Sequence, residues 1–412
     1  MADARGAAGE APTEAPVPPR IIYATYGVGL TANSVAMMLK VVFPLWAIHL
    51  DLSATEIGMA VAASALLPFL LSIHGGVMMD RLGIRRVTLA YVVTTAVAAP
   101  FYPVLPFYST IILLQLITGL TSNMGWVGGQ SLICTFTAGK TALLARFSVA
   151  GKVGTLAAPA AVGAAWDLGG PWGAFLFVTA ASWLVVAAVL LVPGAAENAP
   201  RPSAAQVVRE LAPKWNDYIR AFSLIAIPAV AFVVVMSALR ISSSAIQTSF
   251  YVVYLTEIGL IGTVIGLLVG ISEGAGLLGA FMAGFWERYL KPHWVFILFV
   301  IMSIFCVSVT PALGGLIVLL AVATFGRGYA QGLSQPVMFG ILSRAVGRSQ
   351  QGTSIGLRTT SNRFASLVVP AIMGIVADAV GIEASFLWVG GVLIVLCLAV
   401  ALLVRRIPGF RT

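Results

Sequence analysis

The chain is divided into long apolar runs separated by short polar connections, and this division constrains its fold more than any other feature. Helical segments of about 20 apolar residues are needed to cross a bilayer. Only 9% of the 412 residues are charged, whereas soluble domains carry about 25%. Because these runs are too long for barrel strands, and backbone amides in lipid need internal partners, we predict helices throughout. The predicted spans are 22–48, 56–78, 87–105, 109–136, 147–166, 173–193, 224–255, 261–286, 293–312, 314–341, 355–377 and 384–404.

The basic residues are distributed unevenly over the connections, and this predicts the orientation of the chain. Nineteen of the 24 lysines and arginines fall in the two tails or after an even-numbered helix, when Arg358 at the start of the eleventh span is counted with them, and none falls after an odd-numbered helix. Cytoplasmic connections carry an excess of lysine and arginine. We therefore predict that both termini are cytoplasmic. The net charge of +9 is then a signal of topology and does not call for a nucleic-acid partner.

The sequence also repeats itself. When it is shifted by 211 residues without a gap, charged, proline and glycine residues of one half meet similar residues of the other. This predicts two pseudo-symmetric bundles of six helices in parallel orientation. The matched pairs are Lys152 with Arg363, Pro159 with Pro370, Gly163 with Gly374, Asp167 with Asp378, and Gly170 with Gly381.

Changes in composition set the boundaries of these bundles. Residues 1–20 are rich in Ala, Pro and Glu and lack an apolar segment, so we predict a disordered cytoplasmic tail and no signal peptide. Proline and mixed charges mark 194–221 as a cytoplasmic linker. The bundles are then 21–193 and 222–404, and 405–412 is a second cytoplasmic tail.

A charged connection between the second and third spans carries the most specific motif. A weaker copy returns about 200 residues later, again after a small residue and three spacers. The pattern resembles the loop signature of the major facilitator superfamily, which lies between helices 2 and 3 and again between 8 and 9. Ile84 departs from it, because a basic residue is usual there. The residues that carry the pattern are Gly76, Asp80, Arg81, Gly83, Arg85 and Arg86, with Glu287 and Arg288 in the weaker copy.

In this family the loop contact holds one conformation closed, so the resemblance implies that these residues form a cytoplasmic gate. Gly76 and Gly83 permit close backbone approach and a sharp turn. Asp80 is suited to the positive end of a neighbouring helix or to an arginine across the bundles. The alternative is a solvated loop that serves topology alone.

A second pattern lies in the fifth span, where Gly154, Pro159 and Gly163 resemble the helix 5 motif of bacterial drug/proton antiporters. Small residues let helices approach closely, and an internal proline loosens the backbone. We predict bending there and at the repeat partners Pro370 and Gly374. The alternative is an ordinary packing face of small residues.

Five bases and one acid lie deeper inside the predicted spans than Arg358, and they carry what the sequence says about substrate. A charge at the bilayer centre costs at least about 2.5–3.5 kcal/mol, so such side chains usually face a cavity or a partner. Because five bases outnumber the single acid, we expect the substrate to be an anion that neutralises part of this positive charge. We predict that the substrate is bound by Arg240, Arg327, Lys40, Arg363 and Lys152, together with Asn33.

Other readings of these bases stay open. Arg240 and Arg327 lie near the middle of spans 7 and 10, where a buried structural ion pair is the alternative. Instead of facing a cavity, Lys40 could extend its side chain to the outer lipid headgroups. Lys152 and Arg363 could extend theirs to the inner lipid headgroups. The acid, Glu273, is predicted to carry the coupled proton, with a fixed counter-ion for Arg240 or Arg327 as the alternative.

The sequence does not predict an enzyme. The sequence offers no nucleophile–base pair, nucleotide-binding segment or cofactor motif, and its three cysteines and three histidines form no metal cluster. The resemblance implies a secondary transporter of a bacterial inner membrane, and we expect it to act as a monomer. We predict a proton-coupled exporter of a small organic or amphiphilic anion. A proton-coupled uptake symporter of an organic acid and a broad-specificity drug efflux pump are the alternatives.

Overall fold

The computed structural model describes residues 18–137, 141–193, 223–346 and 351–405. These residues are nearly all helical and contain no strand, which confirms the predicted all-α fold. Most of the expected tails and linker lies outside the described residues.

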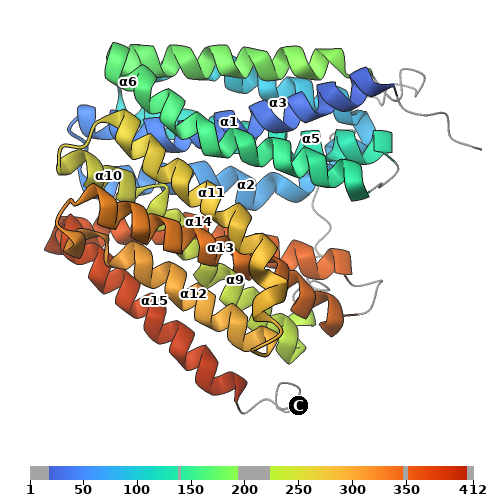
Figure 1. Ribbon diagram of the computed structural model, residues 1–412. Helices are drawn as coiled ribbons and strands as arrows, with labels where there is room; N and C mark the ends of the chain where they lie inside the picture. Colours follow the sequence, from blue (N-terminus) through green and yellow to red (C-terminus); the bar gives the residue numbers. More distant parts are fainter. Residues whose placement is uncertain (1–17, 138–140, 194–222, 347–350, 406–412) are drawn as a thin grey trace, which may run out of the picture.

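Two helical bundles lie one above the other, the N-terminal bundle in blue to green and the C-terminal bundle in yellow to red (Figure 1). The N-terminal bundle comprises α1 (Pro19–His49), α2 (Ala54–Leu82), α3 (Ile84–Ala98), α4 (Phe101–Val104), α5 (Tyr108–Thr137) and α6 (Thr141–Leu191). The C-terminal bundle comprises η1 (Leu224–Ala226), α9 (Pro228–Gln247), α10 (Phe250–Glu257), α11 (Gly262–Trp286), α12 (Pro292–Ser308), η2 (Thr310–Leu313), α13 (Ile317–Ala345), α14 (Gln351–Val380) and α15 (Ile382–Val404).

The repeat found in the sequence is visible as a repeated bend. Gly170 has a φ of 58° inside α6 and divides it into two helices. Its repeat partner Gly381 has a φ of 88° and separates α14 from α15. Side chains other than glycine rarely adopt these conformations, so the two glycines turn the chain at equivalent points of the two bundles.

The seventh predicted span is broken, which the sequence reasoning missed. The helix stops after Gln247 and resumes as α10, with Ser249 at φ −125° and ψ −89°. The hydroxyl of Ser249 donates to the carbonyl of Ala245 at 2.6 Å, and Thr248 donates to Ser244 at 3.0 Å. Hydroxyl groups that bond back to the preceding turn bend and weaken a helix.

Length and hydropathy support a multi-pass membrane protein. Within the described residues, nine helices are long and apolar enough to cross a membrane, one of them the bent α6, and α12 is a shorter apolar helix. Large apolar side chains such as Phe281, Val318 and Trp388 are exposed, as expected for surfaces that contact lipid. The number of twelve crossings stays a prediction, although every expected range falls largely on helix.

The bundles meet through two equivalent helix pairs, α6 with α11 and α2 with α14. A Cβ at Gly163 would overlap the backbone of Gly262, and one at Gly58 would overlap the carbonyl of Pro370. Glycine thus lets both pairs touch backbone to backbone. These contacts support the packing reading of the helix 5 pattern, and bending at Pro159 stays a prediction.

Candidate transport site

A cavity of about 340 Å³ lies between the two bundles. Helices α1, α2 and α5 line it from the N-terminal bundle, and α9 and α14 line it from the C-terminal bundle. Its charged and amide residues are Asn33, Lys40, Gln115, Asn123 and Arg363. Its hydroxyl residues are Ser64, Thr118, Ser122, Ser244, Thr248 and Ser366.

Two predicted substrate-binding bases, Lys40 and Arg363, are brought together at this cavity. Arg363 Nη2 donates to Asn123 Oδ1 at 2.8 Å, which joins α14 to α5 across the bundles. Asn33 also lines the cavity, and its amide donates to the carbonyl of Gly151 at 3.2 Å. No aspartate or glutamate is among the residues that line this cavity. The cavity therefore presents positive charge from both bundles.

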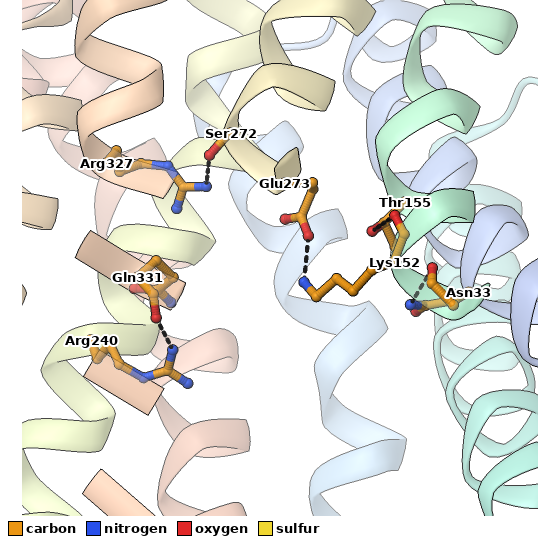
Figure 2. Close-up of polar contacts among 9 residues, drawn as sticks. Asn33, Lys152, Thr155, Arg240, Ser272, Glu273, Arg327 and Gln331 are labelled. Atoms are coloured by element: carbon orange, nitrogen blue, oxygen red, sulfur yellow. Dashed lines mark hydrogen bonds and ion pairs between the residues drawn. The ribbon is translucent and has the colours of Figure 1, made fainter. Parts of the chain in front are cut away.

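The acid Glu273 is paired with a base of the other bundle. Lys152 Nζ lies 2.8 Å from Glu273 Oε2, and Figure 2 shows the two side chains reaching toward each other from α6 and α11. The side chains are 42% and 22% exposed, so water has access to the pair. Glu273 is thus a counter-ion to Lys152, whereas the sequence reasoning considered only Arg240 and Arg327 for that role.

The other two predicted bases, Arg240 and Arg327, lie on helices of the C-terminal bundle (Figure 2). Neither is among the residues that line this cavity. Both are buried, at 5% and 4% exposure. Arg240 Nη1 donates to the backbone carbonyl of Gln331 at 3.2 Å, and Arg327 donates to the hydroxyl of Ser272. Ser272 precedes Glu273, so Arg327 lies within electrostatic range of that carboxylate.

Arg358 is a buried base that the sequence reasoning counted with the cytoplasmic ones, although it falls at the start of the predicted span 355–377. In the structure it lies in α14, two turns after the helix begins at Gln351. The guanidinium lies 4.8 Å from the ring centre of Phe339, which is a cation–π contact.

At the end of the molecule that carries the α10–α11 connection, Asp167 joins the bundles. Its Oδ1 accepts from the backbone N–H of Gly262 at 2.7 Å, and its Oδ2 accepts from that of Thr263 at 2.7 Å. The residue before the helix, Ile261, has no side-chain cap of its own. An aspartate of one bundle thus caps a helix of the other.

Asp378 makes the equivalent contact with α2. Its two carboxylate oxygens accept from the N–H groups of Ala54 and Thr55 at 3.0 Å and 2.9 Å. Ser53 and Glu56 complete this end with a capping box. Sequence reasoning matched Asp167 with Asp378 in the repeat but assigned no role to either, and the matched pair was the signal that could have found them.

The predicted cytoplasmic gate is only partly described. Gly83, at φ 95°, alone separates α2 from α3. Arg85 donates to the carbonyls of Val189 at 3.4 Å and Leu190 at 3.0 Å, so it caps the end of α6 within its own bundle.

The remaining residues of the motif leave the gate as a prediction. The side chains of Asp80 and Arg81 and the surroundings of Gly76 lie outside the described residues. Arg86 is exposed at the start of α3. In the second copy, Glu287 ends α11 and Arg288 is exposed.

No metal site is visible in the described part of the chain, which holds no group of three His, Cys, Asp or Glu side chains that could bind an ion. The polar contacts of the described residues are thus with one another and involve no group suited to bind a metal ion.

Solved structures show the same fold. The nucleoside transporter NupG matches with a TM-score of 0.74 at 16% identity, over 92% of this chain and 98% of that one. A bacterial homologue of the human lysosomal transporter Spinster, inward-facing and unoccupied, matches with a TM-score of 0.73 at 15% identity, over 93% and 96%. A POT family transporter in complex with a thioalcohol-conjugated peptide matches with a TM-score of 0.72 at 14% identity, over 95% and 96%.

Sequence comparison supplies the family. A search of curated proteins found no match. The model of the Major Facilitator Superfamily matches twice, over residues 25–245 and 233–411. These two matches cover nearly the whole described chain and agree with the two bundles. The chain therefore belongs to the major facilitator superfamily, and it is a multi-pass membrane transporter and not an enzyme.

Proposed function

We propose that this transporter is a proton-coupled exporter of a small organic anion in a bacterial inner membrane. One observation carries the proposal: Lys40 and Arg363 line one cavity from opposite bundles, and the lining holds no acid. Lys40 is exposed to the cavity and Arg363 is half-buried, and an anion between them would be attracted by both positive charges. The acid nearest to them in electrostatic terms, Glu273, is already paired with Lys152. An anionic substrate that contacts both residues would hold the two bundles together around itself.

Binding would exploit the weak partner that Arg363 has at the cavity wall. Its guanidinium is held by the neutral carbonyl of Asn123. A carboxylate offers a guanidinium two parallel charged hydrogen bonds, which are about twice as strong as neutral ones. Lys40 supplies a second positive charge from α1. Arg240 and Arg327, buried nearby in the C-terminal bundle, would add to the positive potential without touching the substrate in this conformation.

The ion pair between Lys152 and Glu273 supports the proton-coupled part of the proposal. It joins the bundles, so it must break when the helices that carry it separate. Protonation of Glu273 removes the charge that holds Lys152 and lets the bundles part at lower cost. Deprotonation on the other side of the membrane would restore the pair. A carboxyl in this position couples a proton to the conformational change without contacting the substrate.

The direction of transport rests on weaker support. The small-residue pattern of Gly154, Pro159 and Gly163 resembles that of antiporters. Its last two residues pack against α11 at the bundle interface, and Gly154 packs against α1. The same ion pair would also serve an uptake symporter, which is the alternative we retain. A pump for cationic drugs fits less well, because the cavity lining has no acid to bind a cation.

Ligand binding and flux together test the proposal. Purified protein is screened for thermal stabilisation by matched organic anions, cations and neutral compounds, since a ligand that binds only the folded state raises Tm. We expect stabilisation by anions alone, lost in Lys40→Gln with Arg363→Gln and kept in the control Arg20→Gln, an exposed charge at the start of α1. In proteoliposomes an imposed pH gradient should then drive the stabilising anion. Stabilisation by cations in place of anions would refute the proposal.

A further inference from the structure

We infer that the substrate is a polyhydroxylated carboxylate, such as an aldonic or uronic acid, and not a lipophilic acid. The inference rests on the proposed function and narrows its substrate class. Its basis is the hydrogen-bonding capacity of the cavity wall away from the two bases. Nine of the side chains that line it carry a hydroxyl or carboxamide group, and they alternate with apolar residues such as Phe43, Trp126 and Ile241.

The hydroxyl protons of three wall residues, Ser64, Ser122 and Thr248, are already donated to backbone carbonyls. Ser64 donates to the carbonyl of Val61 at 2.7 Å, and Ser122 donates to that of Thr118 at 2.6 Å. Thr248 donates to the carbonyl of Ser244 at 3.0 Å. A hydroxyl has one proton and two lone pairs, so these three oxygens face the cavity as acceptors. A ligand that satisfies them must bring donors of its own.

The packing of α2 on α5 brings two of these acceptors to one wall. A Cβ at Gly119 would overlap the carbonyl of Ser64, so the two helices touch backbone to backbone at that level. Ser122 lies one turn further along α5, and both serines line the cavity. Thr248, at the break between α9 and α10, faces the same cavity from the other bundle. A ligand with several donors can therefore contact both bundles.

The carboxamide of Asn123 adds a donor to this arrangement. Its Oδ1 accepts from Arg363, and its buried Nδ2 has no hydrogen-bond partner among the described residues. Buried polar groups are normally paired, so this N–H is available to an oxygen of the substrate. It lies beside the guanidinium that we propose for the carboxylate. One ligand oxygen next to the carboxylate, as in a 2-hydroxy acid, would satisfy it.

The positive charge of the cavity determines which kind of hydrogen-bond donor a ligand can carry. An ammonium group would provide N–H donors, but Lys40 and Arg363 repel it and no carboxylate lines the cavity to stabilise it. Hydroxyl groups provide donors without charge. The volume of about 340 Å³ lies at the small end of the usual range for ligand pockets, about 300–1,000 Å³. The cavity thus fits a small acid with several hydroxyl groups.

Matched pairs of acids test this inference separately from the proposed function. Gluconate and hexanoate carry one carboxylate on six carbons and differ in their hydroxyl groups, and glucose supplies the hydroxyls without the charge. We expect gluconate to stabilise the purified protein at an at least tenfold lower concentration than hexanoate, and glucose to have little effect. Equal or better stabilisation by hexanoate would overturn the inference and leave the proposed anion transport intact. Failure of both acids, and of every other anion screened, would overturn both.

Variants locate the preference in the cavity. Ser64→Ala with Ser122→Ala removes two acceptors at nearly constant volume and should cut the preference for gluconate over hexanoate by about fivefold or more, while hexanoate binding is unchanged. Ser148→Ala is the matched control, because Ser148 also donates to the preceding turn, at 3.0 Å, but is exposed on α6. An unchanged preference in the double variant would overturn the assignment of these serines. Tm without ligand, compared with wild type, verifies that each variant is folded.

Discussion

Lys152 and Arg363 occupy equivalent positions in the two bundles, yet they have different partners. Lys152 meets a carboxylate of the opposite bundle, Glu273, at 2.8 Å. Arg363 meets a carboxamide of the opposite bundle, Asn123, also at 2.8 Å. The first base is neutralised and the second is not. A repeat that is symmetric in its backbone is therefore asymmetric in its charge.

The surroundings of the two bases show that the asymmetry is local. Each base lies on a helix that ends in an aspartate, Asp167 or Asp378, and each aspartate caps a helix of the other bundle. Glycine backbone contacts accompany both caps. Since the framework is the same, the difference in partner supports the proposed division of tasks, proton coupling at Lys152 and substrate binding at Arg363.

The largest expected effect on transport comes from removing the carboxylate of Glu273, which pairs with Lys152 and has no counterpart beside Arg363. Glu273→Gln keeps the shape of the side chain but cannot release a proton, so accumulation of substrate driven by a pH gradient should be lost. Exchange of substrate without a gradient should persist, because the cavity is untouched. Proteoliposome flux with and without the gradient measures both. Accumulation at the wild-type level would show that Glu273 is only a counter-ion.

The second largest effect is expected from removing Arg363, the base that has no carboxylate partner. Arg363→Ala should weaken anion binding by about ten- to a hundredfold, since a charged hydrogen bond contributes about 1.5–3 kcal/mol. The affinity of Arg363→Lys should lie between those of wild type and Arg363→Ala, because an ammonium group cannot make two parallel hydrogen bonds to a carboxylate. Lys152→Ala is the matched variant in the other half and should change affinity little. Calorimetric titration compares them, and a larger loss in Lys152→Ala would reverse the proposed division.

A third change makes the second half resemble the first. Asn123→Asp gives Arg363 a carboxylate partner, as Lys152 already has. The guanidinium would then be neutralised, and anion affinity should fall by about tenfold through loss of charge and competition for the same donor. Asn123→Ser, which adds no charge, serves as the control. If Asn123→Asp binds the anion as well as wild type, the free charge of Arg363 does not determine binding.

The smallest effects are expected where the two halves agree. Asp167→Asn and Asp378→Asn each weaken a cap that is worth about 1 kcal/mol, so each should raise the fraction opened at this end by about fivefold. Spin labels at the exposed positions Phe107 and Leu316 would report the separation of the bundles there. Similar shifts in the two variants are expected from the symmetry. A shift in one alone would show that the two caps are not equivalent.

Much of the fold could be predicted from the sequence because apolar runs and the 211-residue repeat are local or additive signals. The break after Gln247 could not, because serine and threonine are common in membrane helices and their back-bonding depends on packing. The site was predicted in part. Lys40 and Arg363 line the cavity, and their predicted contact with substrate stays a prediction. The partner of Glu273 depends on how α11 faces α6, which no sequence period sets.

Arg240 and Arg327 illustrate the same limit. Their central positions in the chain's helices were read correctly, but position along a helix does not fix which way a side chain faces. Both lie within the C-terminal bundle and bond to Gln331 and Ser272. Their predicted contact with substrate stays untested.

For the anionic substrate that we propose from the acid-free lining of the cavity, the charge that crosses the membrane determines the electrical work of transport. Moving one elementary charge across a membrane is worth about 2.3 kcal/mol per 100 mV. Across a membrane that is negative inside, an anion that leaves releases this energy and an anion that enters consumes it. Since Lys40 and Arg363 stay with the protein, they do not cancel the charge that the substrate carries across. Export of a monovalent carboxylate is then favoured by voltage alone, whereas voltage-driven uptake would require at least two protons for each anion.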